Sequence, residues 1–153
     1  MLDEISRQPG TYLLHFYSDR PASITVGRLG SLALTTGYYF YVGSAFGPGG
    51  LRARLRHHYS ISQKPHWHLD YIRPSLKLQQ VWYSHDAVRY EHEWATILHE
   101  VSGLQIPLVG LGASDCRCCS HFFYTRARPD LSSILKALKK NNKMLNLSIV
   151  ESS

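Results

Sequence analysis

An arginine and a histidine on one expected helix are the first residues that could do chemistry. Arg54 and His58 are four residues apart, so on a helix they lie one above the other. They flank an apolar stripe formed by Leu51, Leu55 and Tyr59, which places both side chains at the edge of a packed surface. A guanidinium binds anions through a planar fork of donors, and an imidazole titrates close to neutral pH. The pair is therefore suited to anion binding and proton transfer.

Glu91 is the carboxylate that most needs an explanation. An expected helix over 86–102 carries apolar side chains on one stripe, and counting back three from Trp94 or four from Ala95 reaches Glu91. A carboxylate on a stripe that faces the core is costly unless it is paired, hydrogen-bonded or bound to a metal. A metal ion and a salt bridge to an arginine of a neighbouring element are both open. The stripe comprises Val88, Trp94, Ala95, Leu98 and Val101.

A glycine-rich turn over 43–50 joins an expected strand to the helix that carries Arg54. It holds four glycines and one proline in eight positions. A turn that opens a helix offers free backbone N–H groups, which favour anions. Basic side chains on the helix would strengthen this preference, although they equally suit a solvated face. These side chains are Arg52, Arg54, Arg56 and His57.

Histidines and cysteines gather in two further segments, 66–68 and 115–121. Cys and His are the ligands of structural zinc, but only one residue separates Cys116 from Cys118, and paired zinc cysteines usually have two or more between them. Zn²⁺ is therefore possible but not favoured, and buried thiols with hydrogen-bonded imidazoles rank ahead of it. We favour a role in lining a nucleic-acid groove for four of these side chains, namely His66, His68, Asp115 and His121.

Composition suits one basic domain. The chain has 153 residues, a formal net charge of +6, ten Tyr and three Trp, which is compatible with a nucleic-acid partner. No apolar run approaches the roughly 18 residues that span a membrane, and no signal peptide is visible. The three cysteines lie within four residues, as expected of free thiols. We therefore expect no membrane partner and a cytoplasmic protein; the oligomeric state does not follow from the sequence.

The sequence predicts six strands and three helices, with four of the strands before the first helix. We assign residues 1–140 to a single domain and residues 141–153 to a tail that frays from about residue 146. In the first strand, Tyr12, Leu14 and Phe16 point to one face and His15 to the other. The expected strands cover 10–17, 24–29, 32–36, 38–42, 78–83 and 121–124, and the expected helices cover 50–59, 86–102 and 130–140.

The order of these features resembles the GIY-YIG nuclease superfamily. The two name-giving tripeptides stand here as Gly-Thr-Tyr at 10–12 and Tyr-Val-Gly at 41–43, followed by the Arg54 and His58 helix and then by Glu91. Further stretches resemble one branch, the stand-alone Uri-type endonucleases, so that the similarity covers about 10–124. These stretches are 26–30, 41–45, 66–71 and 112–118.

The resemblance implies an α/β (α+β) fold, with a small three-stranded antiparallel core sheet flanked by helices and an extra strand and helix at the C-terminal end. It also implies hydrolysis of phosphodiester bonds in DNA, single-stranded or structured, with Mg²⁺ or Mn²⁺; RNA stays open as a substrate. Matched by position, Tyr12 and Tyr41 line the site, Arg54 contacts the scissile phosphate, His58 is a polar site residue and Glu91 holds the metal.

Two questions stay open at this stage. Tyr12 ranks slightly ahead of His58 as the general base, although a tyrosine pKa of about 10 must then be lowered by the metal or by Arg54. The late asparagine of the superfamily has no clear match, and Asp115 could assist the metal through a water. The alternative function is a non-catalytic nucleic-acid-binding module on the same fold, for which a carboxylate that repels phosphate would be a poor choice. Arg52 and Arg56 are expected to contact nucleic acid in either case.

Overall fold

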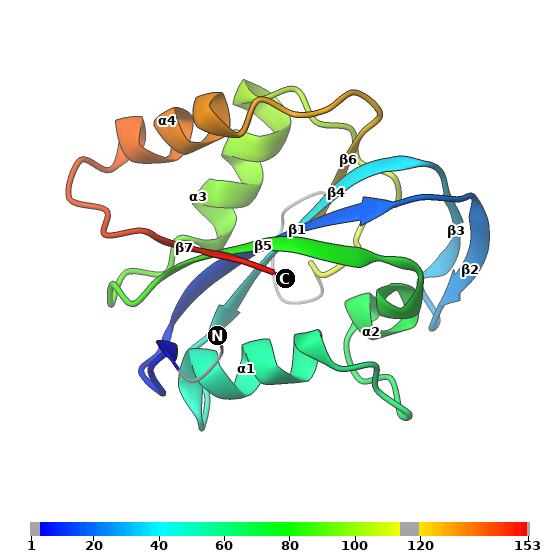
Figure 1. The fold of residues 1–153 in the computed structure, drawn as a ribbon, viewed down its shortest axis with the longest axis horizontal. Helices are drawn as coiled ribbons and strands as arrows, with labels where there is room; N and C mark the ends of the chain where they lie inside the picture. Colours follow the sequence, from blue (N-terminus) through cyan, green and yellow to red (C-terminus); the bar gives the residue numbers. More distant parts are fainter. Residues whose placement is uncertain (1–3, 114–119, 153) are drawn as a thin grey trace.

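A five-stranded antiparallel sheet is the centre of the fold. The computed structural model describes residues 4–113 and 120–152 and orders the strands β6-β4-β1-β5-β7 (Figure 1). The strands of this sheet are β1 (Gly10–Ser18), β4 (Gly37–Ala45), β5 (Lys77–Ser84), β6 (Phe122–Thr125) and β7 (Ser148–Glu151). A separate hairpin consists of β2 (Ala22–Val26) and β3 (Gly30–Leu34).

Helices cover both faces of the sheet. Figure 1 shows α1 and α2 on one side and α3 and α4 on the other. The predicted mixed α/β class is confirmed, and the three central strands β4, β1 and β5 are extended at both edges by β6 and β7. The helical segments are α1 (Gly50–Tyr59), α2 (His68–Ile72), the 3₁₀ turn η2 (Arg73–Ser75), α3 (Glu91–Thr96), the π-helical turn η3 (Ile97–Val101) and α4 (Leu131–Asn141).

The alternation of side chains along β1 divides the core into two layers. Tyr12 and Leu14 belong to the layer beneath α1 and α2, whereas Leu13 belongs to the layer beneath α3 and α4. This is the alternation that the sequence predicts, because successive strand side chains point to opposite faces. Leu51 and Leu55 of α1 are fully buried in the first layer, and they fix which face of α1 meets the sheet.

The helix expected over 86–102 is shorter than predicted. It begins at Glu91, and its last part, η3, is π-helical. The Tyr90 N–H donates to the Thr11 Oγ1 of β1 at 3.2 Å instead of to a helical carbonyl, so the helix does not extend toward residue 86. Val88 and Val101, expected on the buried stripe, are 57% and 65% exposed.

The C-terminal residues also depart from the sequence-based expectation. Residues from about 146 were expected to fray, but β7 pairs with the edge of β5 in antiparallel register, with Val150 opposite Val81. The backbone groups of the β5 edge provide hydrogen bonds that no composition argument reveals. Among residues 4–113 and 120–152, no helix has the length and apolar character needed to cross a membrane.

Candidate active site

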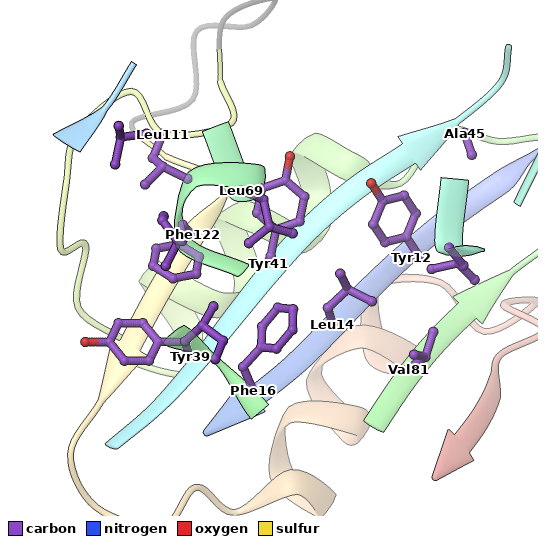
Figure 2. Packing of buried hydrophobic residues seen from close by; sticks show 14 of the residues in the cluster. Tyr12, Leu14, Phe16, Tyr39, Tyr41, Ala45, Leu69, Val81, Leu111 and Phe122 are labelled. Carbon is purple, nitrogen blue, oxygen red and sulfur yellow. The ribbon is translucent and has the colours of Figure 1, made fainter. Parts of the chain in front are cut away.

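A polar pocket of about 460 Å³ opens where β4 ends and α3 begins. It gathers Tyr41, Arg54, Glu91 and His121, four of the predicted site residues, from four separate parts of the chain. Figure 2 shows that Tyr12 and Tyr41 stand on the same face of neighbouring strands, with Leu69 of α2 close to Tyr41. Among described residues, the pocket is also lined by Gly43, Ser44, Phe46, Gly47, Trp67, Arg89, His92 and Gly112.

Tyr41 forms part of the pocket wall although it is only 5% exposed. Burial raises its pKa well above the usual value, with the neighbouring Tyr12 and Glu91 adding to the effect, so its hydroxyl stays protonated and can donate. Gly112 makes room for the ring, because a Cβ there would lie 2.9 Å from Tyr41 Cε1 and the backbone φ is +73°. The Gly112 N–H donates to His68 Nδ1 at 2.9 Å, which ties this loop to α2.

Tyr12 and His58 form a buried pair behind the pocket wall. The Tyr12 hydroxyl lies 2.8 Å from His58 Nε2, and the two side chains are 0% and 2% exposed. Burial raises the pKa of Tyr12 far above its usual value, although Arg54 acts in the opposite direction. Burial also lowers the pKa of His58 to about 3, with the charge of Arg54 adding to it, so His58 is neutral at pH 7.

Gly43, the last residue of the second tripeptide, explains how the Tyr12 hydroxyl fits. Gly43 is directly opposite Tyr12 in the β1–β4 register. A Cβ at residue 43 would collide with the Tyr12 hydroxyl. Gly43 also lines the pocket, so it lies between the Tyr12 hydroxyl and the pocket.

Arg54 is held in place by its two neighbours in the pocket. Its Nη1 donates to the Ser44 carbonyl at 3.0 Å, and its Cζ lies 4.2 Å from the centre of the Trp67 ring. Stacking on an indole and one backbone hydrogen bond restrict the guanidinium while leaving donors for a ligand. Arg89 lies in the same pocket and stacks in the same way, with its Cζ 4.3 Å from the Phe46 ring centre.

Glu91 is the first residue of α3, and its carboxylate faces the pocket. Its Oε2 accepts from Ser44 Oγ at 3.1 Å, and its Oε1 lies 3.4 Å from His121 Nδ1. Burial raises the pKa of Glu91, but the contacts with His121 and Ser44 more than offset this, so the pKa lies below its usual value. Glu91 is therefore ionised at neutral pH. The basic side chain beside it is His121 and not the arginine that the sequence analysis left open, and the metal alternative stays a prediction.

Asp70, which we did not predict as a site residue, organises the segment beside Arg54. Its Oδ2 accepts from the backbone N–H groups of His66 and Trp67, and its Oδ1 lies 2.8 Å from His57 Nε2. Burial would raise the pKa of Asp70, but these hydrogen bonds lower it. The ligand atoms of Asp70, His57 and His58 lie within 4.8 Å of one another, yet both Asp70 oxygens already accept hydrogen bonds. We therefore read this cluster as a hydrogen-bonded support for Trp67.

The start of α1 does not offer the free backbone donors that the glycine-rich turn predicts. The N–H groups of Leu51 and Arg52 donate to the carbonyls of Gln8 and Ser6, at 3.0 and 3.2 Å. The N-terminal segment therefore occupies the position where an anion was expected. The Arg52 side chain also contacts the N-terminal segment, because its Nε donates to the Ile5 carbonyl at 2.7 Å.

The remaining predicted site residues do not line the pocket or lie outside the described residues. His66 stacks edge-on against Trp67 with ring centres 4.7 Å apart, and it is exposed. Arg56 is an exposed residue of α1 and is not among the residues that line the pocket. Three predicted residues, Asp115, Cys116 and Cys118, lie outside the described residues.

Five side chains of the pocket were missed by sequence reasoning: Ser44, Phe46, Trp67, Arg89 and His92. Ser44 directly follows the Tyr-Val-Gly tripeptide and Arg89 precedes Glu91 by two residues, so proximity to the recognised positions was a usable signal. Trp67 carried the same signal, because it lies between the predicted His66 and His68. The stacking of the aromatic rings on the arginines carried none, because Trp67 lies 13 residues from Arg54 and Phe46 lies 43 residues from Arg89.

The fold and pocket together define a mixed α/β domain whose polar pocket holds, among the described residues, one carboxylate and two stacked arginines. Residues 11–144 match the family described as domain of unknown function DUF123, and the chain belongs to this family. No curated protein and no solved structure matches the chain.

Proposed function

We propose that the chain is a metal-dependent endonuclease of the GIY-YIG superfamily that hydrolyses phosphodiester bonds in DNA. The observation that carries the proposal is the pocket that joins Arg54 to an ionised Glu91, with Tyr41 in its wall. Three residues that the resemblance assigns to one site, taken from segments up to 50 residues apart, would otherwise have no reason to meet. The link to DNA rests on the resemblance and on the net charge of +6.

Arg54 and Arg89 supply the phosphate-binding part of the proposal. A phosphodiester gains negative charge in its transition state, and a pre-positioned guanidinium stabilises that charge. Arg54 keeps a fixed orientation because it is bound to Ser44 and stacked on Trp67. Arg89 offers a second cation in the same pocket, suited to a neighbouring phosphate.

Glu91 and its surroundings fit a divalent metal. A single ionised carboxylate in a water-accessible pocket suits Mg²⁺ or Mn²⁺, which keep most of their waters and take one or two protein oxygens. Among the described residues, Ser44 contacts one Glu91 oxygen and His121 lies beside the other, and a carboxylate oxygen can accept more than one such contact. When bound, the metal would orient the phosphate and neutralise the leaving oxygen. Ser44 and His121 hold the carboxylate in place for this role.

The Tyr12–His58 pair is the proposed proton relay. His58 is neutral, so its Nε2 can accept the Tyr12 proton. Because Tyr12 is fully buried and does not line the pocket, its oxygen can take a proton from the attacking water only once the pocket wall opens on substrate binding. The charge of Arg54 contributes to the low pKa of His58, and a bound phosphate would neutralise that charge and make His58 more basic. This assigns the base function to the pair instead of choosing between its members.

The test is cleavage of labelled single-stranded, duplex and branched DNA, and of RNA of the same sequence, with Mg²⁺ or Mn²⁺ and then with EDTA. We expect metal-dependent cutting that Glu91→Ala and Arg54→Ala each reduce by about 100-fold or more, as for loss of a transition-state contact. Glu100→Ala and Arg20→Ala are matched controls, because both residues are exposed and have the same charges. Cutting in EDTA, or full activity of Glu91→Ala, would contradict the proposal. Binding without cutting would favour the non-catalytic binding module.

A further inference from the structure

A second pocket lies at the opposite end of β4 from the pocket that holds Glu91, on the sheet face that α3 and α4 cover. It has a volume of about 210 Å³ and is lined by β1, β4, β5 and the segment that leads into α4. His15 of β1 points to this face, since Tyr12 and Leu14 point to the other. The pocket therefore shares β4 with the candidate active site but lies near the other end of that strand.

His15 is the unusual residue of this pocket. It is only 5% exposed, and neither of its ring nitrogens has a hydrogen-bond partner among the residues that the structure describes. Burial, with the charge of Arg128 adding to it, lowers its pKa to about 4, so the ring is neutral at pH 7. A neutral imidazole has one donor and one acceptor, and leaving both unsatisfied is costly. Stacking on Phe40, with ring centres 4.7 Å apart, fixes the ring but satisfies neither nitrogen.

Two half-buried tyrosines provide flat surfaces beside His15. Tyr17 and Tyr38 are directly opposite each other in the β1–β4 register, and their ring centres lie 5.1 Å apart. The ring of Tyr38 also stacks against His15 at 5.9 Å. Tyrosine rings that are partly open to solvent are stacking surfaces for the bases of nucleic acids.

Two polar side chains, Arg128 and Gln79, also line the second pocket. Arg128 is exposed and lines the pocket, so its guanidinium can pair with a phosphate without displacing another element. Gln79 lines the pocket as well. It falls at an irregularity in the β1–β5 pairing, where His15 is opposite Gln80 but Phe16 is opposite Leu78. Such bulges turn a side chain away from the regular strand direction.

We propose that this pocket binds a nucleobase, with Tyr17 and Tyr38 stacking on its ring, His15 facing its polar edge and Arg128 pairing with its phosphate. A volume of about 210 Å³ suits a single ring system, because pockets for larger ligands begin at about 300 Å³. The base comes from a free nucleotide or from an unpaired position of a strand. The site is independent of the proposed nuclease function, and its test uses no cleavage.

The experiment records the ring-nitrogen NMR signals of the histidines of the whole protein in EDTA during titration. The probes are adenosine 5′-monophosphate, inorganic phosphate and a short oligothymidylate. We expect the nucleotide or the oligothymidylate to shift the His15 signals, and phosphate alone to leave them in place. A shift with the monophosphate identifies a free nucleotide as a sufficient ligand, whereas a shift with the oligothymidylate alone identifies the strand.

Variants separate this pocket from general attraction to a basic surface. Arg128→Ala should weaken binding of the active probe about fivefold to tenfold, as expected for loss of one charge-assisted contact. Arg126→Ala is the matched control, since Arg126 is exposed but does not line the pocket. His15→Phe, which keeps the stacking on Phe40, should also weaken binding; if it fails to fold, the exposed Arg128 still carries the test. Any of three results would overturn the proposal. The His15 signals would stay unshifted with the nucleotide and with the oligothymidylate, or phosphate alone would shift them equally, or the two arginine variants would lose binding equally.

Discussion

The Tyr12 hydroxyl and His58 Nε2 lie 2.8 Å apart in a part of the molecule that is closed to solvent. The two residues are 46 positions apart in sequence and come from β1 and α1. Their contact joins the central strand of the sheet to the helix that carries Arg54. Because the pair is buried, each member depends on the other to satisfy its polar atom.

The first prediction concerns the stability of this pair. Tyr12→Phe should lower the free energy of unfolding by about 1–3 kcal/mol, because it leaves His58 Nε2 buried without a partner. His58→Leu should also destabilise, but adding Tyr12→Phe to it should cost much less than Tyr12→Phe alone, because the hydroxyl has already lost its partner. Urea unfolding of the two single variants and the double variant measures the coupling. Strictly additive losses would show that the hydrogen bond contributes nothing.

The second prediction concerns pH. The pKa of His58 is about 3 in the folded protein, against about 6.5 in an unfolded chain. Below pH 6.5 the unfolded chain therefore binds a proton that the folded chain does not. The contribution of His58 to the free energy of unfolding is therefore complete above pH 6.5. It falls by about 1.4 kcal/mol per pH unit between pH 6 and pH 4. His15, with a pKa of about 4, acts in the same direction.

Unfolding in urea at a series of pH values from 7.5 to 4.5 checks this dependence. The His58→Gln variant should show a shallower loss of stability across the same range, because the titrating group is gone. The Arg20→Ala variant serves as a control that removes an exposed charge and should keep the wild-type slope. A slope that is the same with and without His58 would mean that His58 is not held neutral by burial.

Local periodicity explains how much of this arrangement could be foreseen. The span of α1 was correct because Leu51 and Leu55 repeat at helical spacing, and that placed Arg54 correctly. Glu91 does face the pocket, and the two stripe residues from which it was placed, Trp94 and Ala95, are buried as predicted, although Val88 and Val101 are exposed. The sequence could not reveal the partners of Glu91, because Ser44 and His121 are brought to it only by the packing of α3 against β4 and the segment before β6.

The third prediction concerns the stacking of Arg54 on Trp67. Trp67→Leu removes the ring that orients the guanidinium but leaves the charge in place. We expect DNA cleavage to fall about threefold to thirtyfold, which corresponds to a cation–π contribution of roughly 0.5–2 kcal/mol. Arg54→Lys, which keeps the charge but loses the planar fork, should lose more activity than Trp67→Leu. Steady-state cleavage rates of the three proteins give the order, and a wild-type rate in Trp67→Leu would remove Trp67 from the site.

The fourth prediction uses two of the glycines that line the pocket, Gly43 and Gly47. Gly43→Ala places a methyl group against the Tyr12 ring and hydroxyl, which should destabilise the fold by about 1–3 kcal/mol. Gly47→Ala is the matched control, because it lines the same pocket and its Cβ would meet nothing within 4 Å. Replacing Tyr12 by Leu in the Gly43→Ala background should recover part of the loss, since the clash is with the end of the tyrosine. Urea unfolding of the three variants tests this, and equal effects of the two glycine substitutions would show that Tyr12 does not press against β4.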